Sequence, residues 1–385
     1  MHKRPLLPLL IIVLLASFSF SSEKKIRKTT SATAVRKIQV ALLLDVSNSM
    51  DGLINQAKAQ LWNMVTTLGK AQCNDNVVPQ VEVAIYEYGR TDNEVAKGYV
   101  KKLSDFTQDL DSVSNILFGL TTQGGEEYCG QVIFNSLDEL NWNNNPNEYK
   151  VIFIAGNEDF LQGKLSFTKA CQKAKEKGVI VNTIYCGDKM RGIAEHWDLG
   201  GECGGGSFTN INSNVKDIDV ATPYDSALMV LNVRLNGTYI GYGSLGASNV
   251  ARQAKQDEMA YAFSTKAGAK RAEAKAMSNT YNNASWDLVD AMRADSTYYK
   301  KIDKATLPDS LKNKTIEEVK QVILQKTAER YTLQQQILKL NASRSQYIAT
   351  EKAKNANGNG DKTLETAVEA AIREQAKRYK MIITN

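Results

Sequence analysis

Residues Gln39 to Met50 read Gln-Val-Ala-Leu-Leu-Leu-Asp-Val-Ser-Asn-Ser-Met, and this stretch decides how the 385-residue chain is interpreted. Its aliphatic run is typical of a β-strand that is buried on both faces. The run ends at Asp45, and Ser47 and Ser49 follow at alternating positions. One carboxylate and two hydroxyls on a loop leaving a parallel strand are hard oxygen donors that suit Mg²⁺. Open α/β sheets bind ligands at this end of their strands, so the stretch predicts a cation site there.

The rest of the first half predicts strands that alternate with helices. Apolar residues recur at helical spacing directly after the loop, from Leu53 to Leu68. Further strands are expected over residues 81–88, 149–155, 179–185 and 204–211. The alternation predicts a doubly wound, mostly parallel, Rossmann-like α/β sheet. An α-helical region is expected to follow it.

Residues 40–50 resemble the first strand and loop of von Willebrand factor type A (VWA) domains, whose loop carries the metal-ion-dependent adhesion site (MIDAS) of the family. The resemblance covers Arg36 to about Asn214. Two later motifs depart from the adhesive type. Residues 120–126 match the pattern Leu-x-x-x-Gly-Gly-Thr, but Glu126 stands where a metal-coordinating Thr is usual. Ala155-Gly156-Asn157 aligns with the Thr-Asp-Gly motif of the family, so Gly156 takes the position of the usual Asp.

The resemblance therefore implies a modified metal site. Its expected ligands are Asp45, Ser47, Ser49, Glu126 and Asn157. Mg²⁺ is the expected ion, with Mn²⁺ or Ca²⁺ as alternatives, because the donors are all oxygens. Asn157 or Glu158 would replace the missing carboxylate, and Thr121 or Thr122 would serve instead of Glu126 if the loop folds back.

The first residues have the pattern of an export signal. A short basic region precedes an apolar run from Leu6 to Phe20, and small residues follow it. We expect a signal peptide over residues 1–21, a linker over 22–35, the VWA domain over 36–214 and the helical region over 215–385. An uncleaved anchor is the alternative. No cysteine follows the apolar run, so a lipoprotein anchor is not expected, and the predicted location is periplasmic or secreted.

The numbers of cysteines and histidines limit which disulfides and which kinds of catalytic or metal site the chain can form. An oxidising compartment makes a disulfide plausible, and Cys129–Cys186 or Cys186–Cys203 is the expected pair. Only His196 remains if His2 is removed with the signal peptide. This count excludes sites made of several histidines and most hydrolases that use a histidine base.

The second half is rich in Ala, Lys, Gln and Glu and is expected to be helical. Heptads from Ile316 place apolar residues on one seam, but Lys326, Arg330 and Arg344 lie on the same seam. Since a dimeric coiled coil disfavours such charges in its core, packing of helices within one chain is expected. Residues 36–214 are expected to fold without this region. Residues 154–159 and 221–243 resemble, more loosely, exported bacterial VWA proteins.

Three functions fit the sequence. The first is a binding module whose metal accepts an acidic side chain of a protein partner, with the helical region contacting a cell-envelope complex. The second is a structural or scaffold protein with a vestigial metal site. The third is a metal-assisted hydrolase using Asp45, Glu126 or Glu158, but no nucleophile–base pair is visible. A binding module without enzymatic activity, and without a nucleic-acid partner, is therefore the prediction.

Overall fold

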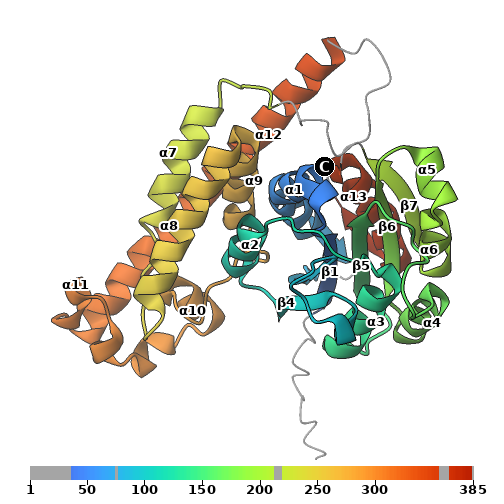
Figure 1. Ribbon diagram of the computed structural model, residues 1–385. Helices are drawn as coiled ribbons and strands as arrows, with labels where there is room; N and C mark the ends of the chain where they lie inside the picture. The colour runs from blue at the N-terminus through green and yellow to red at the C-terminus, as the bar shows by residue number, and fades with distance from the viewer. Residues whose placement is uncertain (1–35, 74–76, 212–218, 355–363, 384–385) are drawn as a thin grey trace, which may run out of the picture. The chain divides into compact units, whose positions relative to one another are not determined.

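The computed structural model describes residues 36–73, 77–211, 219–354 and 364–383. Among them, six strands form one sheet in the order β4-β3-β1-β5-β6-β7, and β2 pairs with β8 (Figure 1). β4 is antiparallel to β3, and the other neighbours in the large sheet are parallel. The predicted doubly wound, mostly parallel sheet is confirmed. The strands are β1 (Lys37–Asp45), β2 (Ala71–Cys73), β3 (Gln80–Tyr88), β4 (Val100–Thr107), β5 (Tyr149–Gly156), β6 (Ile180–Cys186), β7 (Gly205–Ile211) and β8 (Met381–Ile383).

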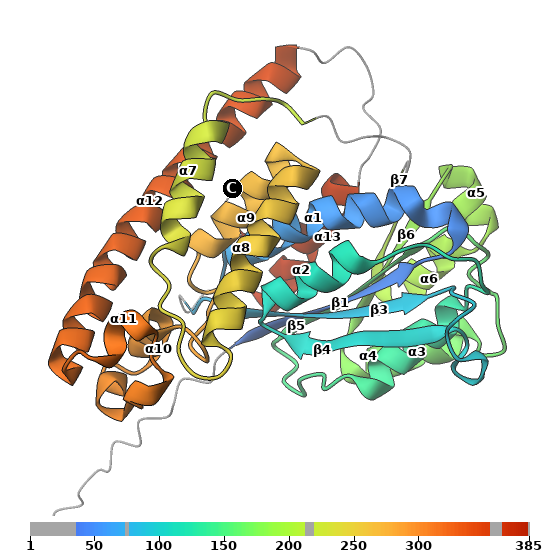
Figure 2. The ribbon, with the colours of Figure 1, turned by 60° about the vertical axis from the view of Figure 1, so that its left-hand side comes forward.

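Helices cover both faces of the large sheet, and the predicted helical region follows β7. The helices are α1 (Asp51–Gly69), α2 (Leu110–Gly119), α3 (Cys129–Glu139), α4 (Phe167–Lys177), α5 (Lys189–Ala194), α6 (Trp197–Cys203), α7 (Asp225–Asn236), α8 (Gly246–Phe263), α9 (Thr265–Ala276), α10 (Leu288–Ala294), α11 (Asp309–Lys312), α12 (Ile316–Lys354) and α13 (Leu364–Ala376). Figure 2 shows α1 and α2 on one side of the sheet and α3 and α4 on the other.

Strand β1 lies in the middle of the sheet, between β3 and β5. Its side chains alternate between two cores, as strand geometry requires. Val40 and Leu44 belong to the core that contains α1 and α2, whereas Ala41 and Leu43 belong to the core that contains α3 and α4. All four are buried. The aliphatic run therefore forms the strand with two buried faces that its sequence predicts.

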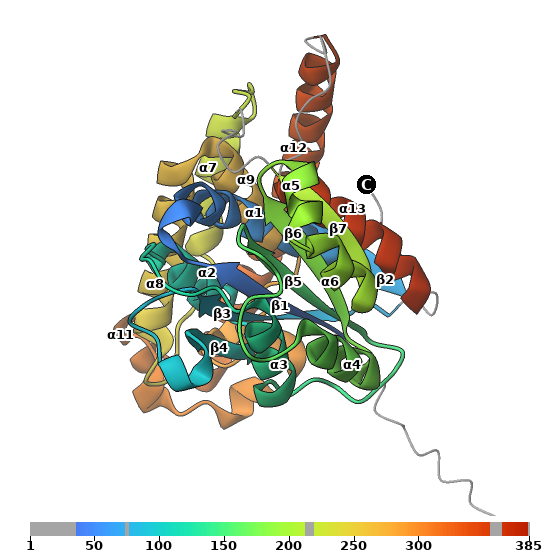
Figure 3. The ribbon, with the colours of Figure 1, turned by 45° about the vertical axis from the view of Figure 1, so that its right-hand side comes forward.

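The last helix, α13, returns to the sheet after the helical region. Figure 3 shows it beside β7 and close to β2. Ile372 of α13 is fully buried in the core shared with α1. The Gln375 side chain accepts a hydrogen bond from the Tyr149 hydroxyl at 2.9 Å, and its amide donates to Asn182 Oδ1 at 2.6 Å. The backbone amide of Leu364 donates to the Gln56 side chain at 3.2 Å.

This return changes the expected domain organisation. α13 supplies part of the core on the α1 face, so residues 36–214 do not contain the whole of that core. Whether they fold without the helical region stays a prediction. β8 also pairs with β2, which follows α1 directly. The described residues 219–354 are therefore an insertion between β7 and α13. The predicted boundary at residue 214 falls outside the described residues and stays a prediction.

A network of buried charges joins the insertion to the sheet's helices. Arg271 of α9 is fully buried and pairs with Asp111 of α2 at 2.7 Å and with Asp257 of α8 at 2.5 Å. Its guanidinium also stacks 4.6 Å from the ring centroid of Trp62 in α1. Lys275 pairs with the other oxygen of Asp257 at 2.8 Å. Since removing one partner of a buried pair costs roughly 3–5 kcal/mol, this network fixes α9 against α1 and α2.

Helix α12 packs within the chain, as expected from its seam. Val319 and Ile337 of the seam are buried. Arg330 pairs with Asp287 at 2.7 Å, and Arg344 pairs with Asp225 at 2.7 Å. The arginines that disfavour a dimeric coiled coil therefore have intramolecular carboxylate partners.

The disulfide differs from the prediction. Cys171 of α4 is joined to Cys203 of α6, whereas Cys129 and Cys186 are buried thiols. The predicted pairs Cys129–Cys186 and Cys186–Cys203 are wrong. Cys186 faces the core on the α1 side of the sheet, while Cys129 faces the core on the α3 side. The sheet therefore separates Cys186 from Cys129 and from the helices that carry the disulfide.

The predicted signal peptide and linker, residues 1–21 and 22–35, lie outside the described residues. Within the described ranges, no helix combines the length and the apolar character needed to cross a membrane.

The packing of α13 predicts a large effect for a substitution near the end of the chain. Ile372→Ala removes a fully buried side chain and should lower the free energy of unfolding by about 2–5 kcal/mol. Ile382→Ala, at a side chain that is 64% exposed in β8, is the control and should change it by less than about 0.5 kcal/mol. Urea unfolding followed by tryptophan fluorescence measures both. Equal effects would contradict the docking of α13.

The disulfide predicts that its removal destabilises the protein. Cys171 and Cys203 are 32 residues apart, so replacing both with alanine should lower the free energy of unfolding by about 3–4 kcal/mol through loss of the cross-link. A reducing agent should destabilise the native protein by a similar amount and leave the double variant unchanged. Peptide mapping without reductant should find the Cys171–Cys203 link. A link that involves Cys186 would overturn the assignment.

Candidate metal-binding site

The parallel strands bring several loops to one edge of the sheet. Asp45 at the end of β1 is in register with Tyr88 of β3, and Leu44 is in register with Ala155 of β5. β1 and β5 lie where the strand order reverses, which is where open α/β sheets bind ligands. The loop after β1 carries Ser47 and Ser49, and the loop after β5 begins with Asn157. The edge therefore gathers four of the predicted ligands from two loops.

Asp45 is the centre of this edge. Its side chain is fully buried. Its Oδ1 accepts a hydrogen bond from the Ser47 backbone amide at 2.8 Å, but its Oδ2 has no hydrogen-bond partner among the described residues. The Ser47 and Ser49 hydroxyls are 3.3 Å apart. Asn157 Nδ2 donates to Ser49 Oγ at 3.1 Å. Asp45, Ser47, Ser49 and Asn157 thus form one polar cluster around an unpaired carboxylate oxygen.

Glu126, which is a predicted ligand, and its neighbour Glu127 differ in burial. Glu126 is exposed, whereas Glu127 is buried. A Cβ atom placed on Gly89 would lie 2.9 Å from Asp45 Oδ1 and 3.6 Å from Glu127 Oε1. Both carboxylates therefore approach the same small volume beside Gly89. Sequence reasoning missed Glu127, because two adjacent glutamates give no sign of which one turns inward.

The negative charges of the carboxylates at this edge raise the pKa values of their neighbours. Burial raises the pKa of Asp45 to about 7, and the charge of Glu158 adds to the rise; hydrogen bonds from Ser47 and a weaker contact with the Asn157 backbone amide oppose it. Burial also raises the pKa of Glu127 to about 8, and the charges of Asp45 and Glu158 are the next causes. The charges that act most strongly on both carboxyl groups are therefore those of other carboxylates. A cation between them would remove this repulsion.

The two threonines named as alternatives to Glu126 have other partners. Arg90 donates hydrogen bonds to the backbone carbonyl and the hydroxyl of Thr121, at 2.8 Å and 3.3 Å. The Thr122 hydroxyl donates to Asp51 Oδ1 at 2.5 Å. These contacts hold the loop between α2 and α3. Neither hydroxyl is bonded to the cluster around Asp45.

Gly156 stands where the family has an aspartate, and its surroundings leave no room for a side chain. A Cβ atom there would lie 2.5 Å from the Tyr88 hydroxyl, 3.0 Å from Asp45 Oδ2 and 3.1 Å from Trp197. The Tyr88 hydroxyl is fixed by donating to the Ala155 carbonyl at 2.9 Å. Tyr88 and Trp197 therefore occupy the space that a carboxylate at residue 156 would need.

The residues at this edge fit a hard divalent cation. The donors are carboxylate, hydroxyl and amide oxygens, which Mg²⁺, Mn²⁺ and Ca²⁺ prefer. The unpaired, fully buried Asp45 Oδ2 is the observation that favours an ion, because a buried charge needs a partner. As the side chains stand, no group of three or more His, Cys, Asp or Glu residues in the described ranges is arranged to hold a metal. A cation would therefore depend on Ser47 and Ser49 as well.

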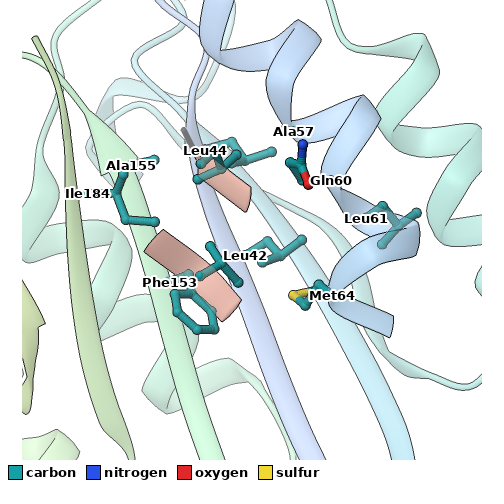
Figure 4. A pocket seen from close by; sticks show the side chains of 11 residues that line it. Leu42, Leu44, Ala57, Gln60, Leu61, Met64, Phe153, Ala155 and Ile184 are labelled. Carbon is teal, nitrogen blue, oxygen red and sulfur yellow. The ribbon is translucent and has the colours of Figure 1, made fainter. Parts of the chain in front are cut away.

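A separate hollow lies deeper, between the sheet, α1 and α13. It measures only about 40 Å³, and Figure 4 shows Leu42, Phe153 and Met64 lining it. Its walls are almost entirely apolar, so it offers no ligands for a cation. It is distinct from the cluster around Asp45.

Solved structures of other proteins, VWA domains among them, are similar to parts of the chain. The VWA domain of SpRpn10 is 15% identical, with 46% of this chain and 88% of that chain covered and a TM-score of 0.34. An aerotolerance-related membrane protein from Bacteroides fragilis is 16% identical over 46% of this chain and 93% of that chain, with a TM-score of 0.32.

Proximal thread matrix protein 1 from the mussel byssus, with a zinc-occupied MIDAS motif, is 13% identical, with a TM-score of 0.34. The match covers 46% of this chain but only 41% of the mussel protein. At these identities and TM-scores the likeness carries no conclusion about function. No protein-family model matches the chain, and no curated protein does.

The crowding at Gly156 gives a testable result. Gly156→Ala should lower the free energy of unfolding by about 1–3 kcal/mol, because the added methyl group overlaps three fixed neighbours. Adding Tyr88→Phe removes the closest of them, so the double variant should lose less than the sum of the two single losses. Gly119→Ala is the control, since a Cβ there meets nothing within 4 Å. Equal stability of the Gly156 and Gly119 variants would contradict the explanation for the missing carboxylate.

Proposed function

We propose that the protein is a VWA-type binding module that holds a divalent cation at Asp45 and recognises a protein partner at this edge of the sheet. The observation that carries the proposal is the Asp45 carboxylate, which is fully buried and has one oxygen without a partner. Asp45, Ser47 and Ser49 would hold the ion directly or through water, with Asn157 on the β5 side. Mg²⁺ is the proposed ion, with Mn²⁺ and Ca²⁺ as alternatives.

The cation would hold the loops of this edge in one arrangement, which a partner can contact. Its loops are attached to a rigid sheet, which suits recognition of a surface. The proposed partner is a protein, and neither enzymatic activity nor a nucleic-acid partner is proposed. The contact by an acidic side chain and the envelope complex remain predictions.

The proposed location is outside the cytoplasm, in the periplasm or the secreted fraction of a bacterium. The residues at the start of the chain support it, and so does the disulfide between Cys171 and Cys203, since structural disulfides persist in oxidising compartments. Amino-terminal sequencing of the mature protein should find a start near Ser22, whereas an intact Met1 would support the uncleaved anchor.

Thermal unfolding at pH 8 in EDTA, Mg²⁺, Mn²⁺ or Ca²⁺ tests the metal. The native protein should gain about 2.7 kcal/mol at a hundredfold excess of metal over Kd. Asp45→Asn should abolish this gain. In EDTA the variant should be at least as stable as the native protein, because it removes a buried charge without a partner.

Asp92→Asn is the matched control, because Asp92 is an exposed carboxylate near the same edge, with a side chain 66% exposed. It should keep the gain with metal. If metal leaves the native midpoint unchanged, the scaffold with a vestigial site is the better description. The loss of a carboxylate at Gly156 and the exposure of Glu126 are the observations that favour that alternative.

A further inference from the structure

The strongest further observation is the second buried carboxylate beside Asp45. Glu127 is 8% exposed, and no Lys, Arg or His among the described residues is found in an ion pair with Glu127 or with Asp45. A Cβ added to Gly89 would lie 2.9 Å from Asp45 Oδ1, 2.9 Å from Glu127 Cγ and 3.6 Å from Glu127 Oε1, so the two side chains converge beside Gly89. A buried carboxylate without a basic partner is costly. A cation bound between the two would remove that cost for both.

The loop that carries Glu127 is held in place by the backbone. The Gln123 amide donates to the Val46 carbonyl at 2.8 Å, and the Thr91 amide donates to the Gly124 carbonyl at 2.8 Å. Gly125 lies against the backbone of Gly89, where a Cβ would be 2.6 Å from the Gly89 carbonyl oxygen. Only glycine permits this approach. The contacts attach the loop to the ends of both β1 and β3 and direct Glu127 inward.

We propose that Glu127 is a carboxylate ligand of the cation at Asp45, and that it closes the site to an acidic side chain of a partner. This inference rests on the proposed cation. With Asp45 and Glu127 as ligands, the ion has two carboxylates from its own chain and little net positive charge left. A partner would then be recognised by the surface that the metal orders, and not by donating a carboxylate to the metal.

The ion should be a hard divalent cation with several oxygen ligands. Asp45 and Glu127 supply charge, Ser47 and Ser49 supply hydroxyls, and water completes the set. Ca²⁺ accepts more oxygens and bidentate carboxylates more readily than Mg²⁺ does. The second carboxylate therefore shifts the preference of the site towards Ca²⁺ relative to a site with Asp45 alone.

Titration of the full mature chain with Mn²⁺, with bound water counted by water-proton relaxation, tests the assignment. Glu127→Gln should weaken Mn²⁺ binding by at least about tenfold, since even outer partners of metal ligands contribute 10–100-fold. It should also add exchangeable water to the bound ion. Glu126→Gln makes the same change of charge at the exposed neighbour and should alter Kd by no more than about twofold, because solvent screens its charge.

The Glu127→Asp variant shows whether metal binding depends on the length of the Glu127 side chain or only on its negative charge. It keeps the carboxylate but shortens the side chain by one methylene, so binding should weaken and bound water should increase, although the charge is unchanged. Native affinity in Glu127→Asp would mean that only the field of the carboxylate matters and would overturn direct ligation. Far-ultraviolet circular dichroism in EDTA verifies that each variant is folded.

The outcomes separate this inference from the function on which it rests. If Asp45→Asn abolishes Mn²⁺ binding and Glu127→Gln leaves it unchanged, the cation site stands and the role of Glu127 is overturned. If Glu126→Gln weakens binding and Glu127→Gln does not, Glu126 is the ligand and the inference is wrong. If the native chain binds no Mn²⁺, Mg²⁺ or Ca²⁺, both proposals fail.

A competition experiment tests the closure of the site. Acetate should displace more water from Mn²⁺ bound to Glu127→Gln than from Mn²⁺ bound to the native protein, because Glu127 already occupies the side facing Gly89. Equal displacement of water in the two proteins would show that Glu127 does not close the site and would overturn the closure.

Discussion

A strand with two buried faces determines where the charged residues of this protein can go. β1 has parallel neighbours on both sides and a core on each face, so its aliphatic side chains leave polar chemistry only at its end. Asp45 comes directly after this run and stays fully buried. The hydroxyls of the next loop, the glycines of neighbouring strands and the inward turn of Glu127 all follow from accommodating that carboxylate.

The helical insertion is linked to the same edge through the core and not through the surface. α1 begins at the loop after Asp45, and α2 leads into the loop that carries Glu127. Arg271 of α9 contacts both helices, through Trp62 and Asp111. The loops that gather the carboxylates are thus extensions of helices whose positions a buried ion network determines. The insertion therefore packs on the two helices that adjoin the edge.

The sequence predicted the features that depend on local pattern. The strands, the first helix and the cluster of Asp45, Ser47 and Ser49 follow from hydrophobic periodicity and from the chemistry of one loop. The inward turn of Glu127 could not be predicted, because it depends on how Gly125 approaches Gly89 across the fold. The disulfide could not be predicted either, since it depends on which face of the sheet each cysteine occupies. The metal itself remains a matter for experiment.

The return of α13 has a consequence for how the chain assembles during synthesis. Gln375 bonds to Tyr149 across 226 residues, and Leu364 bonds to Gln56 across 308 residues. The strands are made well before α13, which covers part of their α1 face beside α1 itself. Contacts so distant along the chain form slowly, and uncovered apolar surface invites aggregation in the meantime. Until α13 docks, the apolar side chains that it covers stay exposed, so the sheet reaches its final packing only after the whole helical insertion has been made.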